Sequence, residues 1–358
     1  MQVKMILTNP FVADPRVYKE AKYYVSQGHE VEVLCWDREC KYAIDEEKDG
    51  IRVHRFHIQS VYGSGMKKQL PAYLKFRKAC IKYLKRREYD VLHCHDLDGA
   101  IIGLGVKASV KKVFDMHEYY IRYDNRIVNI IIGEMVQLIQ NRFDRIIYLN
   151  DKQKKDIKAK NANKTLFLPN YPERSVFYDV SKTYSDKIRV GFVGNIRHLK
   201  ASMNMIECCK RFQEMEMHFY GYGHVEEQLK KVSAENVFFH GRYGYSEQNE
   251  IYRNIDMMNC VEDTLKNDGY PIKFYDSLAT KTVLIVDKNS VRAQFVKDKG
   301  IGFLVDVNDI RTYYDMFSAI IESGKELLRQ ARDNYDDIQE SFFWNDVVKC
   351  LDHIEDAL

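Results

Sequence analysis

The chain has 358 residues, of which 45% are hydrophobic and 30% are charged, and its formal net charge is +3. This composition is typical of globular proteins, and the length suits two domains better than a single core. A net charge this small gives no reason to expect nucleic acid as a partner. There is no run of 18 or more apolar residues, so we expect no membrane-spanning helix.

The chain begins with a short apolar run, MQVKMIL, which is typical of a first strand and too short for a signal peptide. Its eight cysteines include no CxxC pair, which favours reduced thiols and a cytoplasmic location. The turn that follows the first strand, residues 9–14, lacks the glycine fingerprint of a dinucleotide site. A nicotinamide or flavin cofactor is therefore not expected.

The first half of the chain alternates short β-branched apolar runs with amphipathic helices, the pattern of parallel α/β units. After a strand over 3–7, a helix is expected that Asp14 caps, Pro15 opens and Gly28 ends. Further strands are expected at 31–35, 90–93, 113–115 and 145–149.

The second half restarts this alternation near Lys187, after a polar stretch over 168–186 that we take as the linker. A helix is expected from about Ala201, and strands are expected at 188–193, 217–220, 237–239, 257–260 and 283–286. The expected fold class is α/β, with two Rossmann-like domains whose parallel sheets face a central cleft. Ligands bind at the carboxyl ends of the strands in such sheets.

The stretch NDGYPIKFYD places two carboxylates, Asp268 and Asp276, eight positions apart around an expected helix start. Pro271 suits the first helical position, and the amides of Ile272 and Lys273 would then point at an anion, with the lysine adding charge. Asp276 can accept hydrogen bonds from a ribose diol, and Asp268 from sugar hydroxyls. A capped amphipathic helix with solvated acids is an equally open interpretation.

A second polar loop, GNIRHLK over 194–200, directly follows an expected strand. Gly194 permits close approach of the backbone to a ligand, and Arg197 and Lys200 can neutralise a diphosphate. Taken alone, the loop reads as a solvated turn with two ordinary cations. Its place at a strand end facing the cleft favours ligand binding instead.

Two histidine motifs follow strands of the first half. In FDMHEYY, His117 can hydrogen-bond a substrate hydroxyl or serve as a structural histidine. In HCHDLDG, the side chains of His93, His95, Asp96 and Asp98 resemble metal ligands. Their spacing within one strand turn does not place four ligands tetrahedrally, so we expect a loop that lines the cleft and no metal.

A basic stretch, Lys67–Glu88, carries nine lysines and arginines and one acid. As a helix it would place Leu70, Leu74, Ile81 and Leu84 on one face. Such a helix suits an anionic membrane surface. The alternative is a helix that packs on the sheet and exposes its basic face to solvent.

Several motifs occur in a specific order: NPFVADPRVYKEAKYYVSQGHEVEVLCWDRE, DVLHCHDLDG, FDMHEYY, PNYPE, VGFVGNIRHLK, FYGYG, VFFHGRYGYSEQNEIY and YPIKFYDSLATKTVLIV. Together they resemble a GT-B glycosyltransferase of family four, of the kind that builds bacterial surface glycans. The resemblance covers nearly the whole chain. It implies an N-terminal acceptor-binding domain over 1–175, a nucleotide-sugar-binding domain over 176–339, and a final helix over 340–358 that crosses back.

The resemblance also implies a hexosyl transfer that retains the anomeric configuration and needs no metal or other cofactor. The family's pair of glutamates corresponds to Asp268 and Asp276, each one methylene shorter, with Asp268 near the donor sugar. His117 corresponds to the active-site histidine. The donor group comprises Gly194, Asn195, Arg197, Lys200, Tyr270, Pro271, Ile272, Lys273 and Asp276, and the acceptor side Asp14, Arg16, His95 and Asp96. Asn195 stands near the family's usual arginine position, so Arg197 is expected to substitute.

The expected partners are a nucleotide sugar, with UDP favoured over GDP, and a saccharide or lipid-linked saccharide acceptor. Contact with an anionic membrane is expected through Lys67–Glu88, at the inner face of the plasma membrane. Two other functions stay open from the sequence. The shortened acids are compatible with a catalytically silent partner subunit, and the fold also hosts sugar-nucleotide epimerases.

Overall fold

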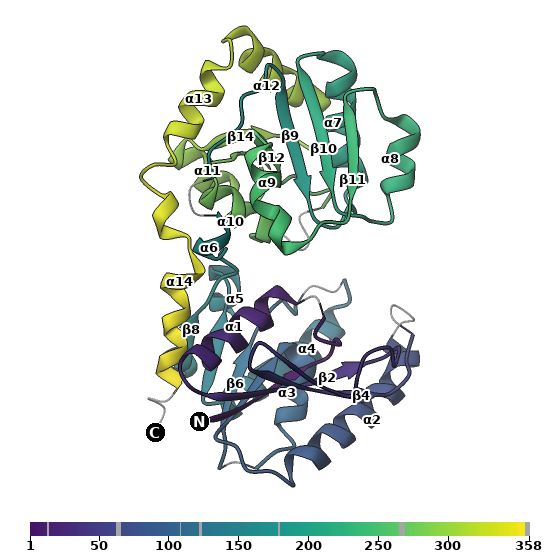
Figure 1. The fold of residues 1–358 in the computed structure, drawn as a ribbon, viewed down its shortest axis with the longest axis vertical. Helices are drawn as coiled ribbons and strands as arrows, with labels where there is room; N and C mark the ends of the chain where they lie inside the picture. The colour runs from purple at the N-terminus through teal and green to yellow at the C-terminus, as the bar shows by residue number, and fades with distance from the viewer. Residues whose placement is uncertain are drawn as a thin grey trace. The chain divides into compact units, whose positions relative to one another are not determined.

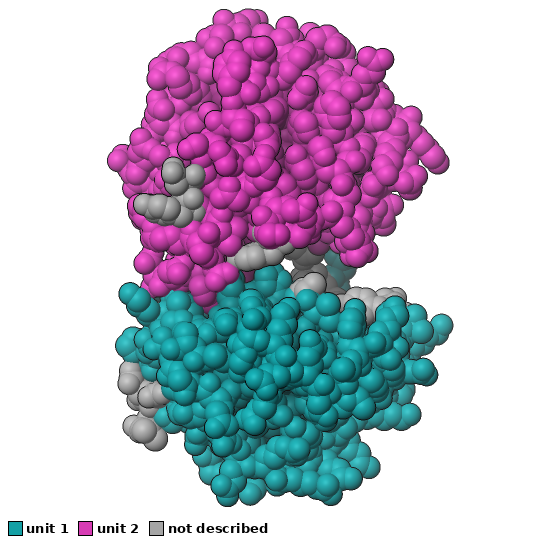
Figure 2. Space-filling model, in the orientation of Figure 1, with its two compact units in different colours: residues 1–169, 347–358 teal, residues 170–346 magenta. Residues whose placement is uncertain are grey.

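The computed structural model describes residues 1–12, 14–61, 66–107, 109–121, 124–177, 180–264 and 269–354. The chain forms two compact units, which are coloured separately in Figure 2. Unit 1 comprises residues 1–169 together with 347–358, and unit 2 comprises residues 170–346. The C-terminal end of the chain therefore belongs to the same unit as its beginning.

Unit 1 is built on an eight-stranded sheet in its described residues, with the order β3-β4-β2-β1-β5-β6-β7-β8. Strands β2, β4, β6 and β8 of this sheet are labelled in Figure 1. Only β3 runs antiparallel to its neighbour among these strands. The central strand β1 has β2 on one side and β5 on the other, so the order reverses there, where ligands bind in such sheets. The strands are β1 (Gln2–Leu7), β2 (Glu30–Asp37), β3 (Asp45–Lys48), β4 (Ile51–His57), β5 (Val91–His95), β6 (Lys111–Asp115), β7 (Arg145–Tyr148) and β8 (Thr165–Phe167).

Helices cover the sheet of unit 1, and a core that includes Trp36, Phe114 and Phe143 fills the space between them and the strands. The C-terminal segment packs here as well, because Tyr23 donates a 2.8 Å hydrogen bond to Asp352. The helices are α1 (Pro15–Ser26), α2 (Met66–Leu84), α3 (Asp96–Gly103), α4 (Arg126–Arg142) and α5 (Asp151–Lys155), with short 3-10 segments at Ala159–Lys164 and Val348–Ile354.

Helix α2 buries only part of the apolar face that the sequence predicted, because Leu84 is buried whereas Leu70 and Leu74 are not. Phe76, Cys80 and Leu84 are buried, and the Phe76 ring stacks on Trp36 with a centroid distance of 5.3 Å. Leu70 and Leu74, at the N-terminal end of the helix, are about half exposed. Aromatic packing against Trp36 therefore rotates the buried face away from the expected leucine row, because a ring buries more apolar surface than a leucine does.

Unit 2 holds a six-stranded, fully parallel sheet in its described part, with the order β11-β10-β9-β12-β13-β14. The order reverses between β9 and β12. The strands are β9 (Ile188–Val193), β10 (Met215–Tyr220), β11 (Val237–Gly241), β12 (Met257–Asn259), β13 (Val283–Asp287) and β14 (Gly302–Val305). The helices are α6 (Arg174–Phe177), α7 (Leu199–Arg211), α8 (Glu226–Val232), α9 (Gln248–Arg253), α10 (Ile272–Ala279), α11 (Ala293–Lys299), α12 (Ile310–Glu322), α13 (Glu326–Asp333) and α14 (Trp344–Val347), with 3-10 segments at Tyr245–Glu247 and Gln339–Ser341.

The structure confirms the expected strands of both halves within one to two residues at most ends. The β3–β4 pair, β8 and β14 were not predicted from the sequence. In the described part of the chain, none of the helices combines the length and the apolar character needed to cross a bilayer.

Candidate functional site

The loop that follows β9 in unit 2 depends on glycines in a neighbouring loop. The backbone amides of Gly194 and Ile196 donate to the carbonyl oxygens of Tyr220, at the end of β10, and Tyr222, in the loop that follows. A Cβ at Gly221 would lie only 1.9 Å from the carbonyl oxygen of Gly194, and one at Gly223 only 2.0 Å from that of Ile196. Gly194 itself has a φ of +128°, which disfavours any other residue. Backbone atoms therefore set the course of this loop.

The polar side chains that this loop carries are exposed. Asn195 and Arg197 both face solvent, as does Lys200 in the first turn of α7. Asp263 accepts a 3.0 Å hydrogen bond from the backbone amide of Lys200, which fixes the start of α7 after the loop. The Lys200 ammonium donates to the Asn308 side chain over 2.6 Å.

Helix α10 begins at the same edge of the sheet, because it follows β12, the neighbour of β9. Its N-cap residue is Pro271, whose side chain cannot accept a hydrogen bond from the first-turn amides. Ile272 is 48% exposed, and Tyr270 stacks against Tyr275 with ring centroids 5.9 Å apart. Pro271 is therefore the N-cap residue and not the first helical residue that the sequence predicted, and among the described residues no side chain caps the first-turn amides of α10. Anion binding at this helix start stays a prediction.

Lys273 is a buried cation in the first turn of α10. Its Nζ lies 3.4 Å from the centre of the Phe192 ring, a cation–π contact. Burial lowers the pKa of Lys273, and the positive charges of Arg292 and Arg197 add to this effect, to about 8. Burial likewise lowers the pKa of His198 to about 4, with Lys273 and Arg197 contributing. A concentration of positive charge therefore exists at this edge.

Arg292 belongs to this cationic group, although sequence reasoning did not single it out. It is fully buried, and it donates a 2.8 Å hydrogen bond to the carbonyl oxygen of Gly269. Its guanidinium lies 3.8 Å from the carboxylate of Glu262. Its position shortly after β13, a strand of the same sheet, could have identified it from the sequence. Residues that follow parallel strands lie at the same edge of the sheet.

Of the two expected acids, Asp268 lies outside the described residues. Asp276 is buried, and it accepts a 3.1 Å hydrogen bond from the hydroxyl of Tyr252. Burial raises the pKa of Tyr243 to about 12, and the charge of Asp276 contributes to that rise. The structure therefore places a carboxylate with tyrosine neighbours one turn inside α10, and sequence reasoning did not anticipate these tyrosines.

Unit 1 carries a different polar group at the carboxyl end of its central strands. Arg16 binds both oxygens of Asp115, at 2.9 and 2.8 Å, and donates to the carbonyl oxygen of Leu168. Asp115 also lies 2.8 Å from Nε2 of His117 and 3.2 Å from Nδ1 of His95. One buried carboxylate therefore links α1, β5 and the turn after β6.

The environment of His117 favours its charged form. Burial lowers the pKa of His117, but the charges of Asp115 and Asp96 outweigh this effect and raise it to about 9. Asp96 also accepts hydrogen bonds from the His117 backbone amide at 3.3 Å and from the Tyr120 hydroxyl at 2.9 Å. Asp96 has a φ of +59°, a strained conformation for this residue. At neutral pH His117 is therefore an imidazolium with a fixed orientation.

Glu20 is a further buried acid, and it lies in a cluster of side chains of the types that bind metal ions. One ligand atom from each of Glu20, His93, His95 and Asp115 lies within 4.8 Å of the others. However, Arg16 binds Asp115 and approaches Glu20 with its Nε 3.1 Å from Oε1. Burial raises the pKa of Glu20 well above its usual value, which favours the neutral acid. The guanidinium thus supplies the positive charge that the cluster needs, and the donor set does not call for a metal ion.

The residues expected on the acceptor side have two kinds of environment in the structure. Asp14 caps α1, because its carboxylate accepts from the amide of Val17 at 3.1 Å. Arg16 and His95 are buried in the network around Asp115, whereas Asp96 is partly exposed beside His117. The structure therefore brings Arg16, His95, Asp96 and His117 together and gives Asp14 a local structural contact. Their acceptor roles stay predictions.

The fold and its two polar edges define a protein with two Rossmann-like α/β units, one edge cationic and the other rich in histidine and acids. Residues 13–171 match the family model of the glycosyl transferase 4-like domain, and residues 174–336 match that of glycosyl transferases group 1. No curated protein is significantly similar to the chain in sequence.

Three solved structures show how closely the fold agrees. Sucrose-phosphate synthase from Thermosynechococcus elongatus has a TM-score of 0.77 at 12% identity, over 99% of this chain and 98% of that one. HepE from Anabaena in complex with UDP has a TM-score of 0.71 at 13% identity, over 100% of both chains. A TarM variant from S. aureus, in complex with Fondaparinux, alpha-GlcNAc-glycerol and UDP, has a TM-score of 0.68 at 12% identity, over 99% of both.

The chain is a glycosyltransferase with the GT-B fold. The expected fold class and the expected enzyme class are thereby confirmed. The assignment to family four and to surface-glycan synthesis stays a prediction.

Proposed function

We propose that this glycosyltransferase belongs to family four and transfers a sugar, with retention of configuration, from a UDP-sugar to a saccharide or lipid-linked saccharide of a bacterial surface glycan. The observation that carries the proposal is the start of α10, where Lys273 and first-turn amides that no described side chain caps lie at the sheet edge that also carries Arg197 and the buried Arg292. A group of like charges is costly unless an anion joins it. HepE and TarM were both solved with UDP, which supports a uridine diphosphate as that anion.

The donor roles follow from the chemistry of each group. The diphosphate binds the first amides of α10 together with Lys273, Arg197 and Lys200. Asp276 accepts hydrogen bonds from the ribose hydroxyls, and the Tyr252 hydroxyl holds one of its oxygens in place. Cations supplied by side chains stabilise the departing diphosphate, so the reaction proceeds without a metal ion.

His117 acts on the donor sugar as a hydrogen-bond donor. Because its pKa is raised to about 9, it is protonated at neutral pH and is a poor general base. The proton of the attacking acceptor hydroxyl therefore goes to an oxygen of the leaving diphosphate. The bond between the anomeric carbon and the diphosphate breaks as the bond to the acceptor oxygen forms on the same face, which retains the configuration.

A thermal-shift panel of UDP, GDP and CMP and their sugars tests whether a uridine diphosphate sugar is the donor. Ligand binding to the native state raises the unfolding midpoint. UDP and UDP-sugars are expected to raise it for the wild type, and the rise is expected to disappear in Lys200→Ala and Asp276→Ala. Lys210→Ala is the matched control, because Lys210 is another exposed lysine of α7. A larger rise with GDP would contradict the uridine assignment, and no rise with any nucleotide would contradict the donor site.

Membrane contact through α2 is a further part of the proposal. The helix packs through Phe76, Cys80 and Leu84, and three lysines on its other faces, Lys75, Lys78 and Lys82, are exposed. Each such lysine near an anionic surface contributes about 1 kcal/mol. Flotation with vesicles containing phosphatidylglycerol is expected to recover the wild type but not a variant with all three lysines changed to glutamate. Changing Lys154, Lys155 and Lys160 instead, also exposed in unit 1, controls for net charge. Equal flotation of both variants would contradict the role of α2.

A further inference from the structure

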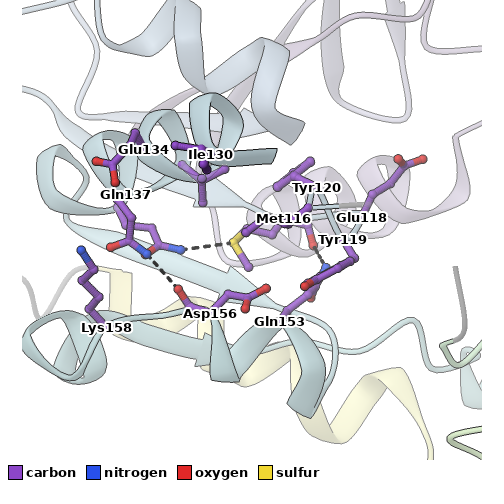
Figure 3. Close-up of a pocket in the computed structure, with 14 residues that line it drawn as sticks. Met116, Glu118, Tyr119, Tyr120, Ile130, Glu134, Gln137, Gln153, Asp156 and Lys158 are labelled. Atoms are coloured by element: carbon purple, nitrogen blue, oxygen red, sulfur yellow. Dashed lines mark hydrogen bonds between the residues drawn. The ribbon is translucent and has the colours of Figure 1, made fainter. Parts of the chain in front are cut away.

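A pocket of about 270 Å³ lies within unit 1, between the turn after β6, helix α4 and helix α5 (Figure 3). Its volume is close to the lower end of small-molecule sites, which start at about 300 Å³. Two of its lining residues, Met116 and Glu118, flank His117 in the chain. The pocket is therefore next to the histidine to which the proposed function gives a role in sugar transfer.

Three glutamines line the pocket, and the structure uses them differently. Both polar atoms of the Gln153 side chain have hydrogen-bond partners. Its oxygen accepts from the Leu149 amide at 2.6 Å, and its nitrogen donates to the Met116 carbonyl oxygen at 3.1 Å. In Gln137 and Gln140, within the described part of the chain, only the side-chain nitrogen has a partner. Gln137 donates to the carbonyl oxygen of Asp156 at 3.0 Å, and Gln140 donates to the sulfur of Met116 at 3.9 Å.

The side-chain carbonyl oxygens of Gln137 and Gln140 are buried and have no hydrogen-bond partner among the described residues. A buried acceptor without a partner costs about 1–3 kcal/mol. A ligand with hydroxyl donors would remove this cost. The contact of the Gln140 amide with sulfur is weak, so this amide can turn toward a ligand with little loss.

The other lining groups narrow the chemistry of that ligand. Tyr119, Tyr120 and Ile130 provide ring and aliphatic surface that suits the C–H face of a sugar. The acids Glu118, Glu134 and Asp156 outnumber the single lysine, Lys158, so an anionic ligand is disfavoured.

Tyr120 connects the pocket to the reacting centre. Its hydroxyl donates to Asp96, and the same carboxylate oxygen accepts from the backbone amide of His117. A sugar that contacts Tyr120 would therefore lie close to His117. This continuity favours a reactant of the transfer over an unrelated metabolite, and the donor groups belong to unit 2.

We propose that this pocket binds an uncharged, hydroxyl-rich sugar residue of the acceptor, and that Gln137 and Gln140 receive its hydroxyl hydrogens. The inference rests on the proposed glycosyl transfer and names the class of acceptor. It assigns the acceptor sugar to residues after β6 and on α4, away from the buried network of Arg16 and His95.

Saturation-transfer NMR with methyl glycosides of glucose, galactose, mannose and N-acetylglucosamine tests the proposal. At least one is expected to receive saturation from the wild type, with a several-fold loss in Gln140→Met. Gln69→Met, a glutamine of α2 outside the pocket, is the matched control and is expected to behave as the wild type. Methyl glucuronide is expected to receive less saturation than the neutral glycosides.

A second variant keeps the test independent of Gln140. A Cβ at Gly133 would meet only Ile121, at the ordinary contact distance of 3.7 Å, so Gly133→Leu can fill the pocket from α4. This variant is expected to lose glycoside binding while its unfolding midpoint stays equal or rises, since glycine weakens a helix interior.

UDP binding and UDP-sugar turnover, measured on the same samples, separate failure of this inference from failure of the proposed function. A protein that binds UDP but transfers saturation to none of the glycosides would overturn the pocket assignment. So would equal saturation in the wild type, Gln140→Met and Gly133→Leu, or a preference for the glucuronide. A protein that fails to bind UDP would contradict the donor site instead.

Discussion

The two units share a topology but place opposite chemistry at the edge where ligands bind. In unit 2 that edge carries Lys273, Arg197 and Arg292 near a helix start, with the carboxylate of Glu262 3.8 Å from Arg292. In unit 1 it carries a carboxylate, Asp115, that pairs with Arg16 and two histidines. The first edge suits a diphosphate, and the second suits neutral hydroxyl groups. One α/β scaffold therefore carries different chemistry in its two copies through a few residues beyond its strands.

The largest expected effect is the loss of the carboxylate that organises unit 1. Asp115→Asn removes the charge that balances Arg16 and His117, and leaving a buried cation uncompensated costs roughly 3–5 kcal/mol. We expect the free energy of unfolding, measured with urea at pH 7, to fall by about this amount. Asp45→Asn is the control, because Asp45 also pairs with a histidine, His54, at 2.6 Å but is exposed.

The same variant should change how stability depends on pH. The pKa of His117 is about 9 in the folded protein, above its unfolded value of about 6.5. The stabilisation is therefore complete below about pH 6.5 and disappears as the pH rises through about 9. Wild-type stability should fall across this window, and that of Asp115→Asn should fall less. Equal slopes for the two proteins would contradict the role of Asp115.

In unit 2, Lys273→Met is expected to separate function from stability. Removing a cation that stabilises a leaving diphosphate should lower kcat/KM for UDP-sugar turnover about 10²- to 10³-fold. Stability should stay equal or rise, because burial already opposes the charge of this amine. Lys210→Met is the control. A loss of activity below tenfold, or a large loss of stability, would contradict this separation.

A smaller effect distinguishes the glutamines of unit 1. Gln153→Met leaves the Leu149 amide and the Met116 carbonyl without their partner, so we expect a loss of about 1–3 kcal/mol in urea unfolding. Gln140→Met removes only a weak sulfur contact and should change stability little. Equal losses in the two variants would show that the wall of the pocket is structural throughout.

The smallest effect is expected from metal removal. EDTA should change UDP-sugar turnover less than twofold, because side chains supply the positive charge at the edge of unit 2. Zn²⁺ should not raise the unfolding midpoint through Glu20, His93, His95 and Asp115. A clear rise that disappears in His93→Ala would identify the cluster as a metal site and revise the account of unit 1.

Apolar runs predicted most strands, because strands buried on both faces of a parallel sheet show an uninterrupted apolar signal. The edge strand β3 was missed since its sequence, DEEK, is entirely exposed. The buried face of α2 could not be predicted, because it depends on the contact of Phe76 with Trp36, which no local pattern reveals.

The polar edges were predictable where a residue follows a strand closely, as His117 and Arg197 do, or where the sequence marks a helix start, as for Lys273 after Pro271. Arg292 follows β13 closely and was not recognised. Glu20 lies four residues after Arg16 on α1, so both belong to one helix face, but only the fold shows that this face meets His93. The pocket glutamines of α4 gave no signal, because an unpartnered oxygen is visible only in three dimensions.

The close contact of Gly221 and Gly223 with the loop after β9 limits which residues can change during evolution or protein engineering. The position of Arg197 depends on main-chain atoms, and a single added methyl group at either glycine would collide with them. Asn195 and Tyr222, which lie between the contacting backbone groups in each loop, are exposed. Selection or a protein engineer can therefore change the side chains at these two positions, provided that both glycines are kept.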